Sequence, residues 1–305
     1  MILFKIQQKY EETTLKKYLL NKYPTLTSSK AAKLIDQNKV RVNNKKSSFN
    51  YQLKIGDEIK CFFNLEPKKI NYDFLNSKQS FQIVYEDKNI IIANKPKGLV
   101  CQEDANEKIN TLNNQLRKYL YQKKEWIPEQ NSTFIPNLCH RLDKYTNGLI
   151  IFAKNEESLK EINVLLKNNN IKKMYKCLVL GVLKNKKQTL VNYWMLDEQK
   201  KIARIDKENK YNKIMITKYE VLEEYDNFSL LNVEIVTGRK HQIRLHLSSI
   251  NHPILGDTKY NKIENMGYKF PCLTSWKIEF NIPESSCLSY LNKKTFELKN
   301  VQFKK

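Results

Sequence analysis

From residue 81 onward, short apolar runs alternate with polar turns, a pattern typical of β-strands. Helical spacing of apolar residues is clearest in two segments between these runs, 156–166 and 240–250. Because strands dominate and helices do not alternate regularly with them, we predict an α+β fold with a mixed, mainly antiparallel β-sheet. The strands are expected at 81–85, 90–93, 148–153, 174–183 and 228–236.

The N-terminal part of the chain follows a different pattern, which predicts two short helices. Thr13 or Thr14 can cap the first helix, and Ser28 or Ser29 can open the second. Each helix then presents one apolar side to a common core.

A β-hairpin is predicted after the second helix. Residues 40–42 alternate as a strand, Asn43 and Asn44 supply a tight turn, and a turn at 56–57 leads into a further strand at 58–63.

The two patterns predict two domains. We expect a small N-terminal α/β domain at 1–63, a linker at 64–80 that contains Pro67, and a larger domain at 81–305.

The charge of the chain calls for a polyanionic partner. Lys and Arg number 54 against 32 Asp and Glu, which gives a formal net charge of +22. Nucleic acid or an anionic membrane would satisfy such an excess. The alternative is a genome biased toward AAA codons, which adds Lys to solvated surfaces without a functional cause. If the N-terminal domain binds nucleic acid, the residues expected to do so are Lys30, Lys33, Arg41, Lys45 and Lys46.

Membrane, secretory and metal-binding classes are disfavoured. No run of about 18 apolar residues could span a bilayer, and the N-terminus lacks the apolar core of a signal peptide. The six cysteines are scattered without a Cys-x-x-Cys pair, which argues against a zinc site or a disulfide framework. We therefore expect a cytoplasmic protein without a metal.

Glycine and histidine are scarce, and their positions indicate where the chemistry lies. The chain has seven Gly and four His. Ordinary usage would give about 7% Gly, so each remaining glycine is expected at a position where the backbone conformation requires it. All four histidines fall between residues 140 and 252, at His140, His241, His246 and His252, and Gly148, Gly238 and Gly256 lie in the same part of the chain.

The stretch at 140–149 brings charged side chains together just before a predicted strand. His140, Arg141 and Asp143 stand at the end of a loop, and Gly148 opens the strand. Neighbouring cations favour the charged form of a carboxylate, and an ionised, partly desolvated Asp can act as a nucleophile or a base. The alternative is an Arg–Asp ion pair with a purely structural role.

A second basic stretch begins where the 228–236 strand ends. Gly238 turns the chain and a helix follows, so free N–H groups at its start, with Arg239, Lys240 and His241, could bind phosphate. The alternative is a basic surface helix that binds nothing.

Arg244 lies in this helix, one residue away from its apolar stripe of Ile243 and Leu247. It is therefore expected at the edge of the core, where a half-buried guanidinium needs an anionic partner. Asp143 is the candidate partner.

Tyr175 lies in the 174–183 strand and allows two interpretations. It could stack on a nucleobase or handle a proton, or it could be an ordinary core aromatic. Two loops stiffened by Pro and Gly, 94–99 and 252–260, could line a cleft or merely connect strands.

Taken in order, these stretches resemble the RluA family of pseudouridine synthases over residues 81–280. Any one motif would be weak evidence, but four or five in the family's order argue against chance. The matching stretches are Asn94-Lys95-Pro96, 140–149, Tyr175, 237–247 and 252–260. The N-terminal domain resembles the S-four RNA-binding domain of the RluC-like branch, most clearly at 40–43 and 56–58.

The resemblance implies a role for each matched residue. Asp143 matches the aspartate that attacks the uridine nucleotide, and the sequence leaves open which atom it attacks. Tyr175 matches a tyrosine that stacks on the flipped base, and Arg244 the basic residue paired with the aspartate. Ile243 is expected beneath the base, and Arg141 is expected to help displace it.

The resemblance also implies a wider pocket and RNA surface. The uracil turns and rejoins the ribose through C5, with no cofactor and no metal. The remaining pocket residues are expected to be Leu142, Asn147 and Gly148, and the RNA contacts Lys95, Arg239, Lys240 and His241.

Two departures from the family pattern remove no catalytic group. Asn147 stands where the family usually has Ser, and Leu273-Thr274-Ser275 stands where Leu-His-Ala is common. We therefore expect a monomeric enzyme that modifies large-subunit (23S) ribosomal RNA. The alternatives are a tRNA enzyme of the same family and a catalytically inactive RNA-binding protein.

Overall fold

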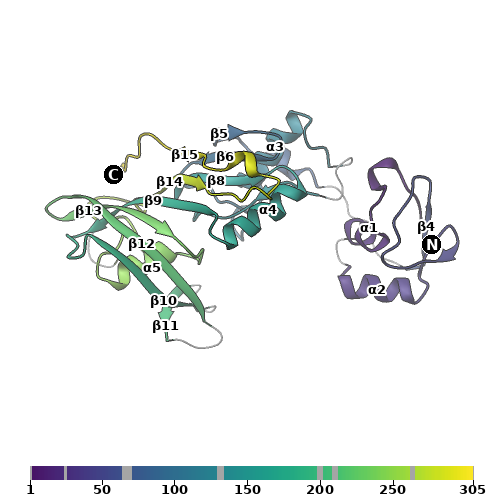
Figure 1. Ribbon diagram of the computed structural model, residues 1–305, viewed down its shortest axis with the longest axis horizontal. Helices are drawn as coiled ribbons and strands as arrows, with labels where there is room; N and C mark the ends of the chain where they lie inside the picture. Colours follow the sequence, from purple (N-terminus) through teal and green to yellow (C-terminus); the bar gives the residue numbers. More distant parts are fainter. Residues whose placement is uncertain are drawn as a thin grey trace. The chain divides into compact units, whose positions relative to one another are not determined.

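The chain divides into two compact units. The computed structural model describes residues 2–23, 26–63, 71–128, 134–197, 202–207, 212–261 and 265–304. One unit comprises Met1–Asp73 with Lys118–Ile135, and the other comprises Phe74–Arg117 with Pro136–Lys305 (Figure 1). Within the described residues, no helix combines the length and apolar character needed to cross a membrane.

The predicted linker lies partly outside the residues that the structure describes. Residues 64–70 are not among the described residues. The segment 71–80 contains a 3-10 helix, Asp73–Asn76, whose Phe74 is buried.

The smaller unit contains the two predicted helices and the predicted hairpin. Its elements are β1 (Ile2–Lys5), a 3-10 helix (Gln8–Tyr10), α1 (Leu15–Lys22), α2 (Ser28–Asp36), β2 (Val40–Val42), β3 (Lys45–Lys46) and β4 (Glu58–Cys61). The strands form an antiparallel sheet in the order β1-β4-β2-β3. The first strand was not predicted.

Both helices of this unit begin at a threonine. Thr14 caps α1 because its hydroxyl accepts the N–H of Lys17 at 3.2 Å. The cap of α2 is Thr27, which accepts the N–H of Lys30 at 3.3 Å. The helix begins at Ser28, one of the two residues predicted to open it, and Thr27 holds the extended backbone that a cap requires.

The two predicted turns of the smaller unit are tied to each other. Asn43 and Asn44 both have positive φ, 49° and 63°, as a two-residue hairpin turn requires. The Asn43 side chain donates to Asp57 at 2.7 Å and accepts the N–H of Glu58 at 2.9 Å. One asparagine therefore fixes the register of the hairpin against the next strand.

The larger unit is built on one mixed sheet, which confirms the predicted α+β class. The strand order is β11-β10-β12-β13-β9-β14-β8-β6-β5, with β15 beside β14 and β7 beside β8. Of the pairings between described strands, β14 with β8 is parallel and the others are antiparallel.

The strands of this sheet include several that the sequence pattern did not predict, among them β10, β11, β12 and β14. The full set is β5 (Gln82–Glu86), β6 (Ile90–Lys95), β7 (Asn137–Leu138), β8 (Asn147–Ala153), β9 (Ile171–Leu180), β10 (Lys187–Asp197), β11 (Ile202–Asp206), β12 (Lys213–Glu224), β13 (Phe228–Ile235), β14 (Leu273–Phe280) and β15 (Thr295–Glu297). The helices are α4 (Glu156–Lys167), α5 (Gln242–Ser249), a 3-10 helix (Ser289–Leu291) and the first part of α3 (Leu112–Gln122), whose residues from Lys118 onward belong to the smaller unit.

The centre of the sheet is covered by α4, which packs on β8 and β9 (Figure 1). Asn155 caps this helix by accepting the N–H of Ser158 at 2.9 Å. Ile162 and Leu165 of α4 lie in one buried cluster with Ile151 of β8. Burying each such side chain contributes roughly 1.5–3 kcal/mol, so β8 is a rigid base for the loop that precedes it.

Gly148 allows β8 to approach β14 closely where the site loop enters the sheet. Its φ is +114°, and a Cβ at this position would lie 2.1 Å from the carbonyl oxygen of Ser275. The parallel pairing places Ser275 directly opposite Gly148. A side chain here would force the two strands apart.

We predict that Gly148→Ala lowers the free energy of unfolding by about 3 kcal/mol or more. The alanine would be strained at this positive φ, and its Cβ would also clash with the backbone of Ser275. The matched control is Gly98→Ala, since Gly98 also has positive φ, +89°, but has no atom within 4 Å of the added Cβ. The control should lose only about 1–2 kcal/mol. Urea denaturation measures both losses, and equal losses would contradict the packing argument.

Candidate active site

Four segments that are distant in sequence converge on one pocket. They are the loop before β8, strand β9, the turn and start of helix α5, and the first residue of β14. The pocket is lined by Arg141, Asp143, Thr146, Tyr175, Arg239, His241, Gln242, Ile243, Arg244 and Leu273. The structure thus brings together Asp143, Tyr175 and Arg244, the three residues predicted to carry the chemistry.

Arg244 bridges two carboxylates. Its Nη1 donates to Oδ2 of Asp143 at 3.1 Å, which is the pairing predicted from the sequence. Its Nε and Nη2 donate to Asp257 at 2.6 and 2.8 Å, a bidentate pair that the sequence did not reveal. The guanidinium also lies over the ring of Tyr260, 5.2 Å from its centroid.

The burial of this network decides what each member can do. The Asp257 side chain is fully buried, Arg244 is 11% exposed, and Asp143 is 29% exposed. Burial alone would lower the pKa of Arg244, but the carboxylates of Asp257 and Asp143 outweigh it and raise that pKa. Asp257 therefore holds the guanidinium in place, while Asp143 keeps an exposed edge toward the pocket.

His241 faces Asp143 from the turn before α5. Its backbone has positive φ, 58°, and its Nε2 lies 3.7 Å from Oδ2 of Asp143. Its Nδ1 is hydrogen-bonded to the hydroxyl of Tyr260 at 2.9 Å. Burial lowers the pKa of His241 to about 4, and the nearby cation of Arg244 acts in the same direction. The imidazole is therefore neutral at neutral pH, and Arg244 is the cation in direct contact with Asp143.

Tyr175 is both a strand residue and a wall of the pocket. It lies on β9 between Val233 of β13 and Ser275 of β14, and it is 5% exposed. Burial is the main cause that raises its pKa, so the hydroxyl stays protonated at neutral pH. Together with Ile243 and Leu273 it gives the pocket an apolar side opposite the charged network.

Gln242 fixes the turn that carries Arg239 and His241, a role that was not predicted from the sequence. Its side-chain oxygen accepts from the Thr237 hydroxyl at 2.8 Å and from the N–H of Arg239 at 3.0 Å. Its amide nitrogen donates to the carbonyl of Ile216 at 2.8 Å. The predicted phosphate site at this helix start therefore lacks the Arg239 N–H, while Lys240 remains exposed.

Lys95 is not an RNA-contacting residue, contrary to the prediction, because it is completely buried. Its ammonium donates to the carbonyls of Pro96, Leu99 and Lys144 at 3.0, 2.7 and 3.1 Å. Burial lowers its pKa to about 8, while the thiol of Cys101 and the carboxylate of Asp143 oppose that shift. Lys95 instead anchors the loop that carries Asp143.

Cys101 adds a second anchor to the same loop. Its Sγ accepts the N–H of Leu142 at 3.3 Å and donates to the carbonyl of that residue at 3.2 Å. Asp143 itself closes the loop, since its carbonyl accepts the N–H of Thr146 at 3.0 Å. The backbone on both sides of Asp143 is therefore held in place.

Other predicted neighbours of Asp143 point elsewhere. His140 is not a cation beside the carboxylate: its Nε2 accepts the N–H of Ile151 at 3.2 Å, and burial lowers its pKa well below the usual value. Leu142 is buried, and Asn147 accepts from the Thr274 hydroxyl at 2.9 Å.

The predicted pocket therefore needs correction at three positions. Leu142, Asn147 and Gly148 shape the loop and the strand, but they do not line the pocket, which has Thr146, Gln242 and Leu273 instead.

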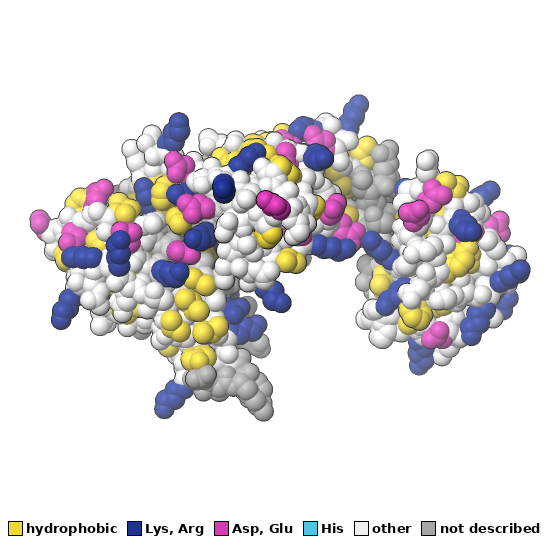
Figure 2. All heavy atoms as spheres, in the orientation of Figure 1, with side chains coloured by type: hydrophobic (Ala, Val, Ile, Leu, Met, Phe, Trp, Pro, Cys, Tyr) yellow, Lys and Arg dark blue, Asp and Glu magenta, His cyan; other side chains and the backbone are white. Residues whose placement is uncertain are grey.

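The predicted RNA-binding lysines of the smaller unit lie on its surface. Lys30, Lys33, Lys45 and Lys46 are exposed, whereas Arg41 is half-buried with its guanidinium 5.1 Å from the ring centroid of Phe62. On the face shown in Figure 2, Lys and Arg side chains are spread over both units rather than gathered in one patch. Their contact with RNA stays a prediction.

Comparisons with known proteins agree with this geometry. Residues 89–249 match the family described as RNA pseudouridylate synthase, and residues 14–59 match the S4 domain. An uncharacterised RNA pseudouridine synthase of Mycoplasma genitalium is 31% identical over 93% of this chain and 90% of its own length. Ribosomal large subunit pseudouridine synthase C of Rickettsia conorii is 36% identical over 83% of this chain and 84% of its own.

A solved structure shares the fold of the larger unit. Human RNA pseudouridylate synthase domain containing 1 superposes with a TM-score of 0.55 over 72% of this chain and 82% of its own, at 21% identity.

We predict that the two carboxylates of the Arg244 network differ in their effect on stability. Asp257→Ala leaves a buried guanidinium without its bidentate partner and should lower the free energy of unfolding by about 3–5 kcal/mol. Asp143→Ala removes a partly exposed carboxylate and should cost less than about 1 kcal/mol. Urea denaturation of both variants distinguishes them, and a larger loss for Asp143→Ala would contradict the assignment of Asp257 as the anchor.

Proposed function

The chain belongs to the RNA pseudouridylate synthase family, and on that premise we propose that it isomerises uridine in large-subunit ribosomal RNA, with Asp143 as the catalytic residue. Two features support the choice of RNA. Relatives in Rickettsia are named ribosomal large subunit pseudouridine synthase C, and the chain carries an S4 domain. We further propose that it works as a monomer in the cytoplasm.

The position of Asp143 carries the proposal. The carboxylate is the partly exposed end of a buried network, and it faces the same pocket as Tyr175 and Ile243. A uridine can reach this pocket only after it leaves its stack, which costs a few kcal/mol and is offset by contacts in the pocket. The isomerisation conserves all atoms: the N1–C1′ bond breaks, a C5–C1′ bond forms, C5 releases a proton and N1 takes one up.

The neighbours of Asp143 fit this reaction. Arg244 supplies a fixed positive charge, so the carboxylate can remain ionised in a pocket that closes over the base. Tyr175 offers an aromatic ring for stacking, and Ile243 and Leu273 complete an apolar wall. Arg141 is exposed at the rim of the pocket, where it can help to displace the base. The Asp143–Arg244–Asp257 network is intact, which argues against a catalytically inactive RNA-binding protein.

We predict that deleting the gene removes pseudouridine from one or more positions of large-subunit rRNA, and that Asp143→Asn fails to restore it. The matched control is Asp226→Asn, since Asp226 is an exposed carboxylate outside the pocket. This variant should restore the modification fully. Pseudouridine mapping of rRNA and tRNA from the same cells gives the readout.

Each contrary result of that mapping has a distinct meaning. Loss of pseudouridine from tRNA alone would move the substrate to tRNA, and no loss from any RNA would reject the enzymatic proposal. Restoration by Asp143→Asn would exclude Asp143 as the catalyst.

We also predict that removing residues 1–63 weakens rRNA binding and flattens its dependence on salt. Each lost lysine–phosphate contact should lower the slope of log affinity against log salt by roughly 0.7–0.9. A filter-binding titration at several salt concentrations measures the slope. An unchanged slope would show that the S4 domain makes no phosphate contacts.

A further inference from the structure

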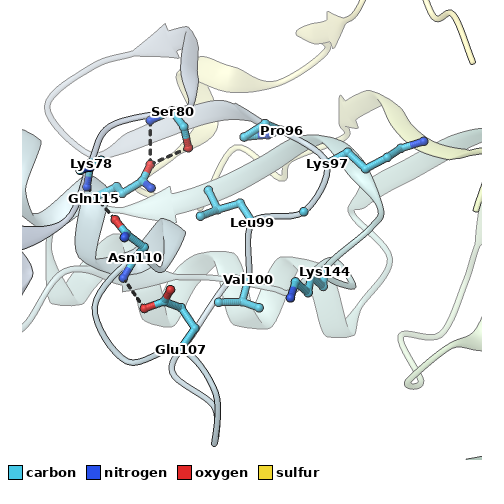
Figure 3. A pocket seen from close by; sticks show the side chains of 11 residues that line it. Lys78, Ser80, Pro96, Lys97, Leu99, Val100, Glu107, Asn110, Gln115 and Lys144 are labelled. Carbon is cyan, nitrogen blue, oxygen red and sulfur yellow. Dashed lines mark hydrogen bonds between the residues drawn. The ribbon is translucent and has the colours of Figure 1, made fainter. Parts of the chain in front are cut away.

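The loop that carries Asp143 also borders a second cleft. Asp143 faces the active-site pocket, whereas the next residue, Lys144, lines a separate cleft of about 420 Å³. This cleft, shown in Figure 3, is lined by Lys78, Ser80, Pro96, Lys97, Gly98, Leu99, Val100, Glu107, Asn110, Gln115 and Lys144. The N–H of Gly98 donates to the carbonyl of Lys144 at 2.9 Å, so its two sides are joined beside the active site.

The cleft carries an uncompensated positive charge. Its lysines are Lys78, Lys97 and Lys144, and in the view of Figure 3 Lys78 and Lys144 lie on opposite sides of it. Its one carboxylate, Glu107, accepts the N–H groups of Ile109 and Asn110 at 2.9 and 2.7 Å.

In the described part of the chain the lysines have no carboxylate in direct contact, although Lys144 is near enough to Asp104 to help lower the pKa of that carboxyl group. Among the residues that the structure describes, none of the three forms an ion pair within 4.0 Å. Lys97 is also half-buried, and this burial lowers its pKa. A partly desolvated ammonium without a counter-charge gains more from an incoming anion than a solvated one does.

A stacked aromatic pair adjoins these lysines. The rings of Tyr145 and Phe270 lie 4.3 Å apart at an interplanar angle of 16°, and Phe270 is 42% exposed. The ammonium of Lys144 lies 5.5 Å from the centroid of the Tyr145 ring.

The position of Phe270 is fixed by a close backbone contact. A Cβ at Gly256 would lie 2.1 Å from the Phe270 carbonyl oxygen. Two residues beyond Phe270, Cys272 is close enough to Lys97 to influence its pKa, and Leu273 already lines the active-site pocket. The aromatic pair and Lys97 therefore lie close to the segment that contributes Leu273 to the active-site pocket.

We propose that Tyr145, Phe270, Lys97 and Lys144 form a subsite for the nucleotide next to the target uridine, a subsite whose occupant rests on the proposed function. The aromatic pair stacks on the base of that nucleotide, and the two lysines pair with its phosphate. When the target uridine flips out, its neighbour loses a stacking partner, and an exposed aromatic ring replaces that partner without regard to base identity. The active-site pocket and this subsite then hold two successive nucleotides across one loop.

The test compares Phe270→Leu, Phe270→Trp, Lys97→Gln and Lys144→Gln in the full-length protein. Affinity and turnover are measured separately on unmodified large-subunit rRNA made by in vitro transcription. Phe270→Leu should weaken RNA binding about 5- to 150-fold and raise KM accordingly, with kcat unchanged at saturating RNA. Phe270→Trp should retain wild-type affinity because it keeps a stacking surface. Each lysine variant should lower the salt slope of binding by roughly 0.7.

The control is a second stacked pair outside this subsite. Tyr225 and Phe228 stack at 4.4 Å and 19°, and Tyr225 is 42% exposed, so Tyr225→Leu matches Phe270→Leu in chemistry and exposure. It should leave affinity and turnover unchanged. Lys160→Gln, which removes a lysine that is 74% exposed and paired with Glu156, controls for the loss of a surface charge.

The outcomes separate this subsite from the proposed function. An active wild-type enzyme whose RNA affinity is unchanged in Phe270→Leu and Lys144→Gln would overturn the subsite and leave the function standing. Equal losses in Phe270→Leu and Tyr225→Leu would also overturn it. A wild-type protein that converts no uridine in rRNA or tRNA would reject the function, and the affinity measurements alone would then decide the subsite. Because Lys144 is exposed, its variant decides the question even if Phe270→Leu unfolds.

Discussion

The site depends on how a buried guanidinium is compensated. A cation as buried as Arg244 requires a matched anion, and Asp257 supplies one through two parallel hydrogen bonds. That bidentate pair fixes the plane of the guanidinium, so the remaining nitrogen is aimed at Asp143. The loop that carries the Asp143 carboxylate is also fixed, because Lys95 and Cys101 form hydrogen bonds with its backbone. Asp143 can thus be positioned without being buried, which leaves one edge free for a substrate.

The sequence predicted the class of the fold and most of its apolar strands, because those strands are buried and carry near-continuous apolar runs. β6 and β8 are such strands. It missed β12, which is rich in Lys and Glu, and also β10, which is mostly apolar and aromatic. Only alternate residues of β12 are buried, among them Met215, Thr217 and Tyr219. Polar residues at core positions such as Thr217 hide the alternation that reveals a half-buried strand.

The site was predictable where a half-buried charge needs a partner and a charged motif offers one, and unpredictable where the partner lies in a segment that resembles a connecting loop. The position of Arg244 beside an apolar stripe predicted Asp143 as a partner, and the structure places them 3.1 Å apart. Asp257 was missed because it lies in a Pro/Gly loop that looked like a connection. Lys95 was misassigned because the sequence does not distinguish a buried lysine that donates to three carbonyls from a lysine exposed to solvent. Its position in the same strand as the apolar run at 90–93, two residues after that run ends, was the available signal.

The most direct test of this account is the chemical step in Asp257→Asn, because Asp257 lies behind Arg244 and outside the pocket lining. The single-turnover rate of uridine conversion should be measured with saturating enzyme, at a temperature where the variant is folded. If Asp257 orients Arg244 and thereby Asp143, the rate should fall by about 100-fold while RNA affinity stays the same. A rate equal to that of the wild type would contradict the claim that this buried pair positions the reacting carboxylate.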